Sequence, residues 1–348
     1  MGNDVLSVRQ MMVLLAVALL SPVTDLLPTL VTRTAGNTGW AAALIALPLL
    51  LAALWAARGA FWQNTGGRAV VRIPIIIVYL LWTLMSLSLS LRLCGARLAV
   101  IYGEGPAFAC ALALLVLTVW MCLGKTAAFA RAAEIFYLAL AVALVLVLAL
   151  AADKIEWGNL SPETGALAGL PVAGITTAGV LLNIAPVAAL AGKIAHPEQG
   201  RRRVVGWTVA FCVVAALALA AVIGCLGPKL TERLPTPFLT MVQGLGVKGA
   251  FQRTEALFAA LWTLSDLVRV GLLLHAWRAL AEKLRPGKWC RWSVLPAVGI
   301  ALLGGWLVYY NVETLRDFCM TVLPLTGIFF GLIVPLILRF ALSRQKRQ

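Results

Sequence analysis

Length, composition and charge exclude a water-soluble globule. Of the 348 residues, 61% are apolar and 12% are charged, whereas soluble domains are about half apolar and about a quarter charged. A membrane crossing takes about 20 residues and a connection about 10 to 15, so the chain has room for roughly ten spans and no separate soluble domain. The sequence therefore predicts a single all-α polytopic membrane domain over residues 1–348.

Apolar windows, each closed by Gly, Pro or charge, mark the expected transmembrane helices. They cover residues 8–33, 39–57, 73–97, 106–123, 126–151, 168–192, 204–227, 254–280, 292–310 and 317–340. With the N-terminus inside, most of the 29 Lys and Arg residues fall on the cytoplasmic side, so both termini are predicted to be cytoplasmic. This distribution explains the net charge of +15 without nucleic acid, and a basic inner face favours anionic lipid.

The longest connection, residues 228–252, predicts an extracytoplasmic amphipathic helix. Its apolar residues recur at helical spacing: Phe238, Leu239, Met241, Val242 and Leu245. Such a helix either only covers the bundle or gates it.

Enzyme chemistry has no support in the sequence. The seven cysteines are scattered and form no C-x-x-C pair. The sequence also has no nucleophile motif, no P-loop and no zinc-type cluster. We therefore expect no enzyme activity, no cofactor and no metal site.

The spans divide into two halves, about 1–152 and 168–348, whose first helices carry comparable interruptions. Span 1 contains LLSPVTDLLP with Pro22, and span 6 contains LLNIAPV with Pro186. Proline removes a backbone donor and frees the carbonyl one turn earlier, which hydrocarbon does not tolerate unless protein or a water-filled cavity satisfies it. The paired breaks predict a five-plus-five inverted repeat with a site at broken helices 1 and 6, the alternative being two ordinary proline kinks.

Acidic residues at mid-membrane depth are the second indication of a site. A carboxylate such as Asp25 is costly there unless it is paired, hydrated or protonated, so it should face a cavity. In span 8, Asp266 and Arg269 are three residues apart on one helix face. They are expected to neutralise each other as an ion pair, with direct ligand contact as the alternative.

Span 3 has two polar faces, and both cannot line one cavity. The longer stripe contains Thr83, Ser86, Ser90 and Arg97, while Ser88 and Arg92 lie nearly opposite. We assign the longer stripe to the cavity and expect Arg92 to snorkel or to pair with a neighbour.

Several segments together carry a family resemblance. The opening SVRQMMVLLAVALLSPVTDLLPTLVTRTAGNTGW resembles the first span and following turn of the spore germination permeases. These are the B subunits of nutrient germinant receptors, within the amino acid–polyamine–organocation transporter superfamily. Supporting segments are LRLCGARLAVIYGEGP after span 3, WGNLSP before span 6 and FQRTEALFAALW entering span 8.

The resemblance implies a ligand pocket among spans 1, 3, 6 and 8. The polar residues that these spans place at mid-membrane depth are the candidate ligand-binding residues: Ser21, Thr24, Asp25, Ser86, Ser90, Asn183, Thr263 and Asp266. It also implies a complex with an A-type membrane subunit and a C-type lipoprotein subunit in the spore inner membrane.

One departure leaves the ligand open. Transporters of this superfamily usually hold the substrate carboxylate on a Gly-rich break in span 1, where this chain has Ser21, Pro22, Val23 and Thr24. Pro22 has no N–H to donate, and Asp25 would repel a carboxylate. The sequence favours a sensor of a small nutrient germinant, an amino acid or similar, and the alternative is a proton- or cation-coupled transporter of such a solute.

Overall fold

A computed structural model describes residues 4–57, 69–162, 166–195, 200–245, 254–309 and 311–345, which are almost entirely helical. In chain order the elements are α1 (Val8–Asp25), α2 (Leu27–Ala35), η1 (Gly36–Ala41), α3 (Ala42–Ala57), α4 (Ala69–Tyr102), α5 (Glu104–Cys122), α6 (Thr126–Ala152), η2 (Trp157–Leu160), α7 (Ala166–Leu182), η3 (Ala185–Lys193), α8 (Arg201–Leu226), α9 (Pro228–Thr231), α10 (Pro237–Gly244), α11 (Thr254–Leu284), α12 (Trp289–Trp292), α13 (Val294–Val308), α14 (Val312–Ile328), η5 (Phe329–Ile333) and α15 (Val334–Gln345).

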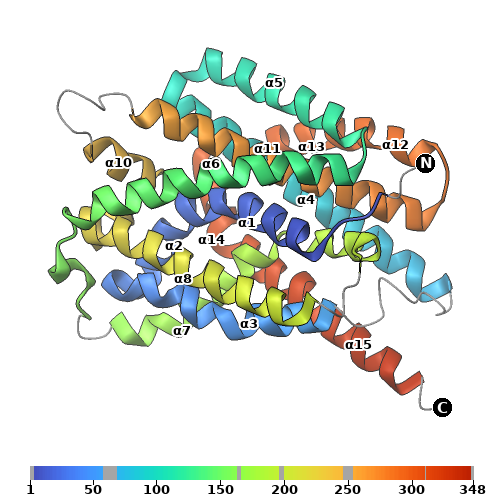
Figure 1. The fold of residues 1–348 in the computed structure, drawn as a ribbon, viewed down its shortest axis with the longest axis horizontal. Coiled ribbons are helices and arrows are strands. Elements are labelled where there is room, and N and C mark those ends of the chain that lie inside the picture. Colours follow the sequence, from blue (N-terminus) through green and yellow to red (C-terminus); the bar gives the residue numbers. More distant parts are fainter. Residues whose placement is uncertain are drawn as a thin grey trace.

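The long helices lie side by side in one bundle (Figure 1). By length and composition, seven segments of the described chain can cross a membrane, or eight if α7 and η3, bent by 47° at their break, form one span. After α2 the chain turns at η1, and α3 runs back along the bundle. In sequence the ten expected spans overlap α1–α2, α3, α4, α5, α6, α7–η3, α8, α11, α13 and α14–α15. Of these, α5 and α11 are not among the counted segments.

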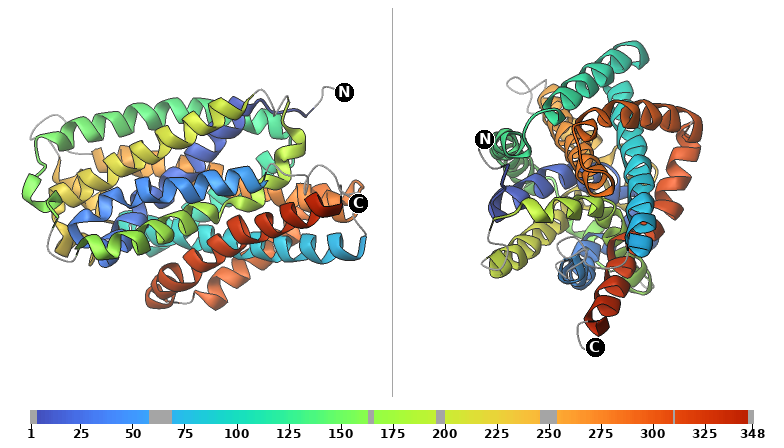
Figure 2. Two further views of the ribbon diagram at one scale, coloured as in Figure 1. Left: turned by 90° about the horizontal axis from the view of Figure 1, so that it is seen from below. Right: turned by 90° about the vertical axis from the view of Figure 1, so that its right-hand side faces the viewer.

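The start of α1 and the end of α15 lie at the same end of the bundle, here called the terminal end (Figures 1 and 2). Helix α10 lies at the opposite end, here called the α10 end (Figure 1). This arrangement agrees with termini on one side of a membrane. That this side is cytoplasmic stays a prediction from the Lys and Arg distribution.

Glycine permits a close helix contact between α7 and α14. A Cβ on Gly327 would lie 1.8 Å from the carbonyl oxygen of Gly179, and one on Gly179 would lie 2.2 Å from that of Pro324. Small residues let membrane helices approach until their backbones touch. The span that contains the Asn183 break is therefore held directly against the last pass of the chain.

We expect Gly179→Ala to destabilise the protein by about 1–3 kcal/mol or more, because the added methyl group overlaps backbone atoms that cannot move aside. Gly206→Ala in α8 is the matched control, since a Cβ there meets nothing within 4 Å. Thermal unfolding of both variants in the same detergent tests this expectation. Equal melting temperatures would contradict the close contact.

The expected amphipathic segment folds into α9 and α10, and residues 246–252 of it lie outside the described residues. In α10, Phe238, Leu239, Met241 and Val242 are buried. The Phe238 ring packs against Trp262 of α11, with 5.7 Å between ring centroids. The apolar face of α10 thus points into the bundle and covers its α10 end.

At the terminal end, the residues before α1 are tied to the segment that follows η3. Leu6 and Ile194 form a parallel β-bridge, and Asp4 Oδ2 lies 2.7 Å from Lys193 Nζ. Asp4 also accepts hydrogen bonds from the Ala127 N–H and the Thr126 hydroxyl. Partial burial raises the pKa of Asp4, but Lys193 and these two donors lower it more, so the net pKa lies below the usual aspartate value.

Candidate functional site

Three charged side chains from three helices meet in the middle of the bundle. Arg97 of α4 lies 3.1 Å from Asp266 of α11 and 3.7 Å from Asp25 of α1, measured between nitrogen and oxygen atoms. All three residues are at most 8% exposed. The Ser21 hydroxyl donates to Asp266 Oδ1 at 2.8 Å and accepts from Arg97 Nη1 at 2.6 Å. Arg97 therefore bridges both carboxylates, and the Ser21 hydroxyl stabilises this arrangement by bonding both Arg97 and Asp266.

Arg269 does not pair with Asp266, so the expected ion pair within span 8 is wrong. Its Nε donates to the Ser90 hydroxyl at 3.0 Å, and its Nη1 donates to the Ala18 carbonyl at 3.4 Å. Asp266 is instead taken by Arg97, which reaches it from the neighbouring helix α4. Together the two arginines and the two aspartates form a cluster with no net charge.

Proline 22 explains why Arg269 finds a backbone partner in α1. Because Pro22 has no N–H, the Ala18 carbonyl one turn earlier lacks its helical donor, and Arg269 supplies one. Yet α1 continues through Pro22 to Asp25, and the non-helical residue is Leu26, whose N–H still donates to the Pro22 carbonyl at 3.1 Å. Span 1 is thus broken in its hydrogen bonds at Pro22 without being unwound there.

Ser265 of α11 interrupts the backbone hydrogen bonds of α1 at a second position. Its hydroxyl accepts from the Ser21 N–H at 3.1 Å and donates to the Val17 carbonyl at 2.6 Å. In a regular helix these two backbone groups would bond each other. A side chain of α11 therefore stands between two turns of α1 and locks the two helices together. Sequence reasoning missed Ser265, although it lies on the same face of α11 as Asp266 and Arg269.

We expect Ser265→Ala to destabilise the protein by about 1–3 kcal/mol, because buried groups of α1 lose a hydrogen-bond partner. Ser88→Ala is the matched control, since the Ser88 hydroxyl makes one bond, to the Ala301 carbonyl at 2.7 Å. The midpoints of thermal unfolding decide the comparison. A larger loss for Ser88→Ala would contradict this role of Ser265.

The second break lies between α7 and η3, at Asn183 and Ile184. Pro186 stands just after it, in the first turn of η3, where proline is well tolerated. The fully buried Asn183 side chain accepts at Oδ1 from Trp82 Nε1 and from the Ser86 hydroxyl, each at 3.1 Å. Its Nδ2 is buried without a hydrogen-bond partner. The break of span 6 is therefore held by span 3 and retains one unused donor.

The two breaks are linked through α4. The Ser90 hydroxyl accepts from Arg269 and donates to the Ser86 carbonyl at 2.7 Å. On the opposite face of α4, Ser88 bonds the Ala301 carbonyl and Arg92 Nε donates to the Tyr309 carbonyl at 2.9 Å. Of the stripe assigned to the cavity, Ser90 and Arg97 line it, whereas Thr83 and Ser86 do not. The opposite face packs against α13.

The space enclosed by the charge cluster is small, about 10 Å³, roughly that of one water molecule. Of the candidate residues, those lining it are Ser21, Asp25, Ser90 and Asp266. Ser86 and Asn183 form the adjoining cluster described above. The Thr24 hydroxyl donates to the Leu20 carbonyl and accepts from Trp262 Nε1, and half-buried Thr263 lies outside the lining. The lining side chains therefore occupy nearly all of the space between the helices at this point.

A solved structure shares this fold. The crystal structure of MhsT in complex with L-phenylalanine matches with a TM-score of 0.64 at 18% sequence identity, over 94% of this chain and 89% of that chain. No family model matches the sequence, and no curated protein matches it.

The fold is therefore LeuT-like, in agreement with the inverted-repeat architecture expected from the paired breaks and the family resemblance. This chain is a polytopic all-α membrane protein of transporter-like fold, with its polar cluster where α1, α4 and α11 meet and the α7–η3 break beside it.

Proposed function

We propose that this chain is a ligand-sensing, transporter-like subunit that binds a small zwitterionic nutrient, such as an amino acid, as in a spore germinant receptor. The observation that carries the proposal is the self-paired charge cluster between α1, α4 and α11, in which Arg97 bridges Asp25 and Asp266 and Arg269 lies beside them on Ser90. Its charges are balanced and buried. The sequence resemblance to the germination permeases and the LeuT-like fold support the same assignment.

A zwitterion matches this cluster chemically. The ammonium group of the ligand can replace Arg97 beside Asp25 and Asp266. The carboxylate of the ligand can then form a bidentate pair with the released Arg97 guanidinium. A ligand with only one of these charges would leave the opposite partner buried and unpaired, which costs several kcal/mol. We therefore propose Ser21, Asp25, Ser90 and Asp266, with Arg97 and Arg269, as the ligand-contacting residues. Thr24, Ser86, Asn183 and Thr263 remain proposed members of the outer lining.

The cluster suits a switch better than rapid turnover. About 10 Å³ of space does not admit an amino acid, so binding requires the Arg97 bridge to open. Breaking a buried pair costs about 3–5 kcal/mol when one partner is lost. A ligand that offsets this cost shifts the chain between two states, which is sufficient for sensing through A-type and C-type partner subunits.

Coupled transport is the second candidate, and one observation favours it. Asp25 Oδ1 is buried and has no hydrogen-bond partner, so this carboxylate has a free position for a proton or a cation. A proton-coupled transporter needs such a group to change its charge during the cycle.

Ligand binding to the purified chain tests the charge argument. We expect zwitterionic L-amino acids as a class to compete for the site, and their amine-only and carboxylate-only analogues to bind at least tenfold more weakly, about 1.4 kcal/mol. Equal affinity of the amine-only analogues would contradict the zwitterion assignment. Absence of binding by every compound in the panel would contradict the proposed site itself.

A further inference from the structure

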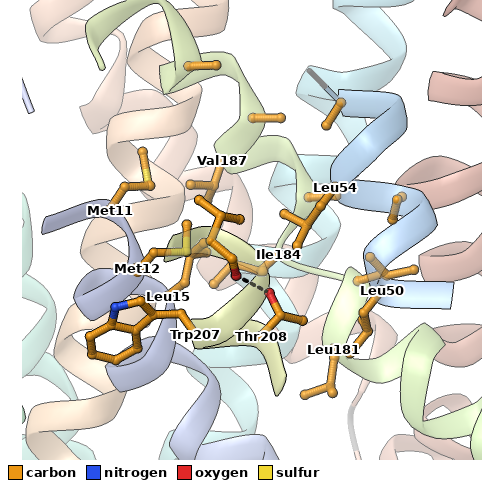
Figure 3. Close-up of a pocket in the computed structure, with 18 of the residues that line it drawn as sticks. Met11, Met12, Leu15, Leu50, Leu54, Leu181, Ile184, Val187, Trp207 and Thr208 are labelled. Atoms are coloured by element: carbon orange, nitrogen blue, oxygen red, sulfur yellow. Dashed lines mark hydrogen bonds between the residues drawn. The ribbon is translucent and has the colours of Figure 1, made fainter. Parts of the chain in front are cut away.

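A second, larger cavity lies away from the charge cluster, toward the terminal end. It encloses about 450 Å³, within the roughly 300–1,000 Å³ typical of small-molecule sites. Figure 3 shows its walls: Met11, Met12 and Leu15 of α1 face Leu50 and Leu54 of α3, with Ile184 and Val187 at the α7–η3 break. Trp207 and Thr208 of α8 complete it.

The cavity wall is apolar in its interior. The Thr208 hydroxyl, one of its few polar groups, is already used, since it donates to the Val204 carbonyl at 2.8 Å (Figure 3). Methionines such as Met11 and Met12 are flexible and adapt to the shape of an apolar guest. A hydrocarbon chain matches this interior, and a hydrophilic solute does not.

The charges that line the cavity are of one sign. Among its described lining residues, the charged ones are Arg201, the first residue of α8, and Arg339 in the middle of α15. The Arg339 guanidinium is held over the Trp55 ring, 3.6 Å from the centroid, and donates to the Trp55 carbonyl. Arg201 is exposed. Arg201 begins the candidate membrane span Arg201–Leu226, and Arg339 lies one residue before the end of the candidate span Glu313–Phe340. The cavity is therefore apolar within and cationic where these two spans end.

We propose that this cavity binds one anionic phospholipid, with an acyl chain between α1, η3, α3 and α8 and its phosphate group at Arg201 and Arg339. Arginine recognises phosphate through paired N–H donors, and burial of each CH₂ group adds to the affinity of the chain. The proposal does not depend on the identity of the nutrient ligand. A chain in this position contacts both break-bearing segments, α1 and η3, together with α3 and α8, and so opposes their relative movement.

Lipid binding to the purified protein in nanodiscs tests the proposal. We expect phosphatidylglycerol to be retained at least tenfold more strongly than phosphatidylcholine, as measured by native mass spectrometry, and to raise the melting temperature. Glycerol phosphate without acyl chains should do neither, which separates a lipid from a free phosphate. Equal retention of phosphatidylcholine, or the same thermal shift with glycerol phosphate, would overturn the assignment.

Matched variants locate the site. The double variant Arg201→Gln/Arg339→Gln should lose the preference for phosphatidylglycerol, whereas Arg202→Gln/Arg203→Gln, which changes exposed neighbours outside the lining, should keep it. Ala188→Phe should fill the cavity and reduce retention of both lipids, and Ala16→Phe from the facing wall gives a second filling variant if the first does not fold. The same loss in Arg202→Gln/Arg203→Gln, or full retention in a folded filling variant, would refute this site.

Discussion

Arg97→Leu is expected to destabilise the protein by about 3–5 kcal/mol, because it leaves Asp25 and Asp266 buried without their shared partner. The Arg97 guanidinium also lies over the Trp262 ring, 5.7 Å from the centroid, and this contact is lost as well. Chemical or thermal unfolding in detergent measures the loss. The change should reduce the amount of folded protein more than any other single substitution proposed for this chain.

Arg92→Leu on the same helix is the control for Arg97→Leu. Arg92 is half-buried and bonds one carbonyl oxygen at the end of α13, so its removal should cost about 1 kcal/mol or less. Adding Asp25→Asn to Arg97→Leu should recover part of the stability, because the buried charges that remain, Asp266 and Arg269, then balance each other. Equal losses for Arg97→Leu and Arg92→Leu, or no recovery in the double variant, would contradict a cluster held by charge.

Asp25→Asn is expected to weaken ligand binding at least tenfold while the protein still folds. The contact of Asp25 with Arg97 is the longer of the two, at 3.7 Å, and the 3.1 Å pair of Arg97 with Asp266 stays intact. The variant therefore removes a ligand-facing charge and leaves the stronger bridge. Titration of an amino acid that binds the parent protein, together with protein yield, measures the two effects separately.

Asp317→Asn, which alters an exposed carboxylate of α14, is the matched control and should change neither quantity. Failure of Asp25→Asn to accumulate, with Asp317→Asn unaffected, would show that Asp25 is structural. Unchanged affinity in a well-folded Asp25→Asn protein would remove Asp25 from the site.

The fold was predictable because the membrane restricts the possible architectures. A chain with 61% apolar residues and few charges can only form packed spanning helices. The proline and the polar neighbour found in both span 1 and span 6 indicated that these two spans occupy equivalent places in the two halves. The exact form of the breaks was not predictable. Pro22 stays inside α1 because Ser265 and Arg269 supply the missing hydrogen-bond partners from another helix.

The site was only partly predictable for a similar reason. Depth in the membrane follows from position in a span, and Ser21, Asp25, Ser90 and Asp266, which were chosen by depth, line one cavity. Partnership across helices depends on how each helix is rotated, and nearly uniform apolar spans give little information about rotation. The Arg97 bridge therefore replaced the pair expected within α11. Arg201 and Arg339 line one cavity although they are 138 positions apart in the sequence, which no local pattern indicates.

The most direct test of the sensing function measures binding and uptake on the same proteoliposomes, with this chain as the sole protein. The self-paired cluster predicts saturable binding of an amino acid, weakened by Asp25→Asn, without accumulation of the amino acid inside the vesicles under an imposed proton gradient. Steady, saturable uptake by the chain alone, with no partner subunit present, would contradict the sensing function and establish a transporter.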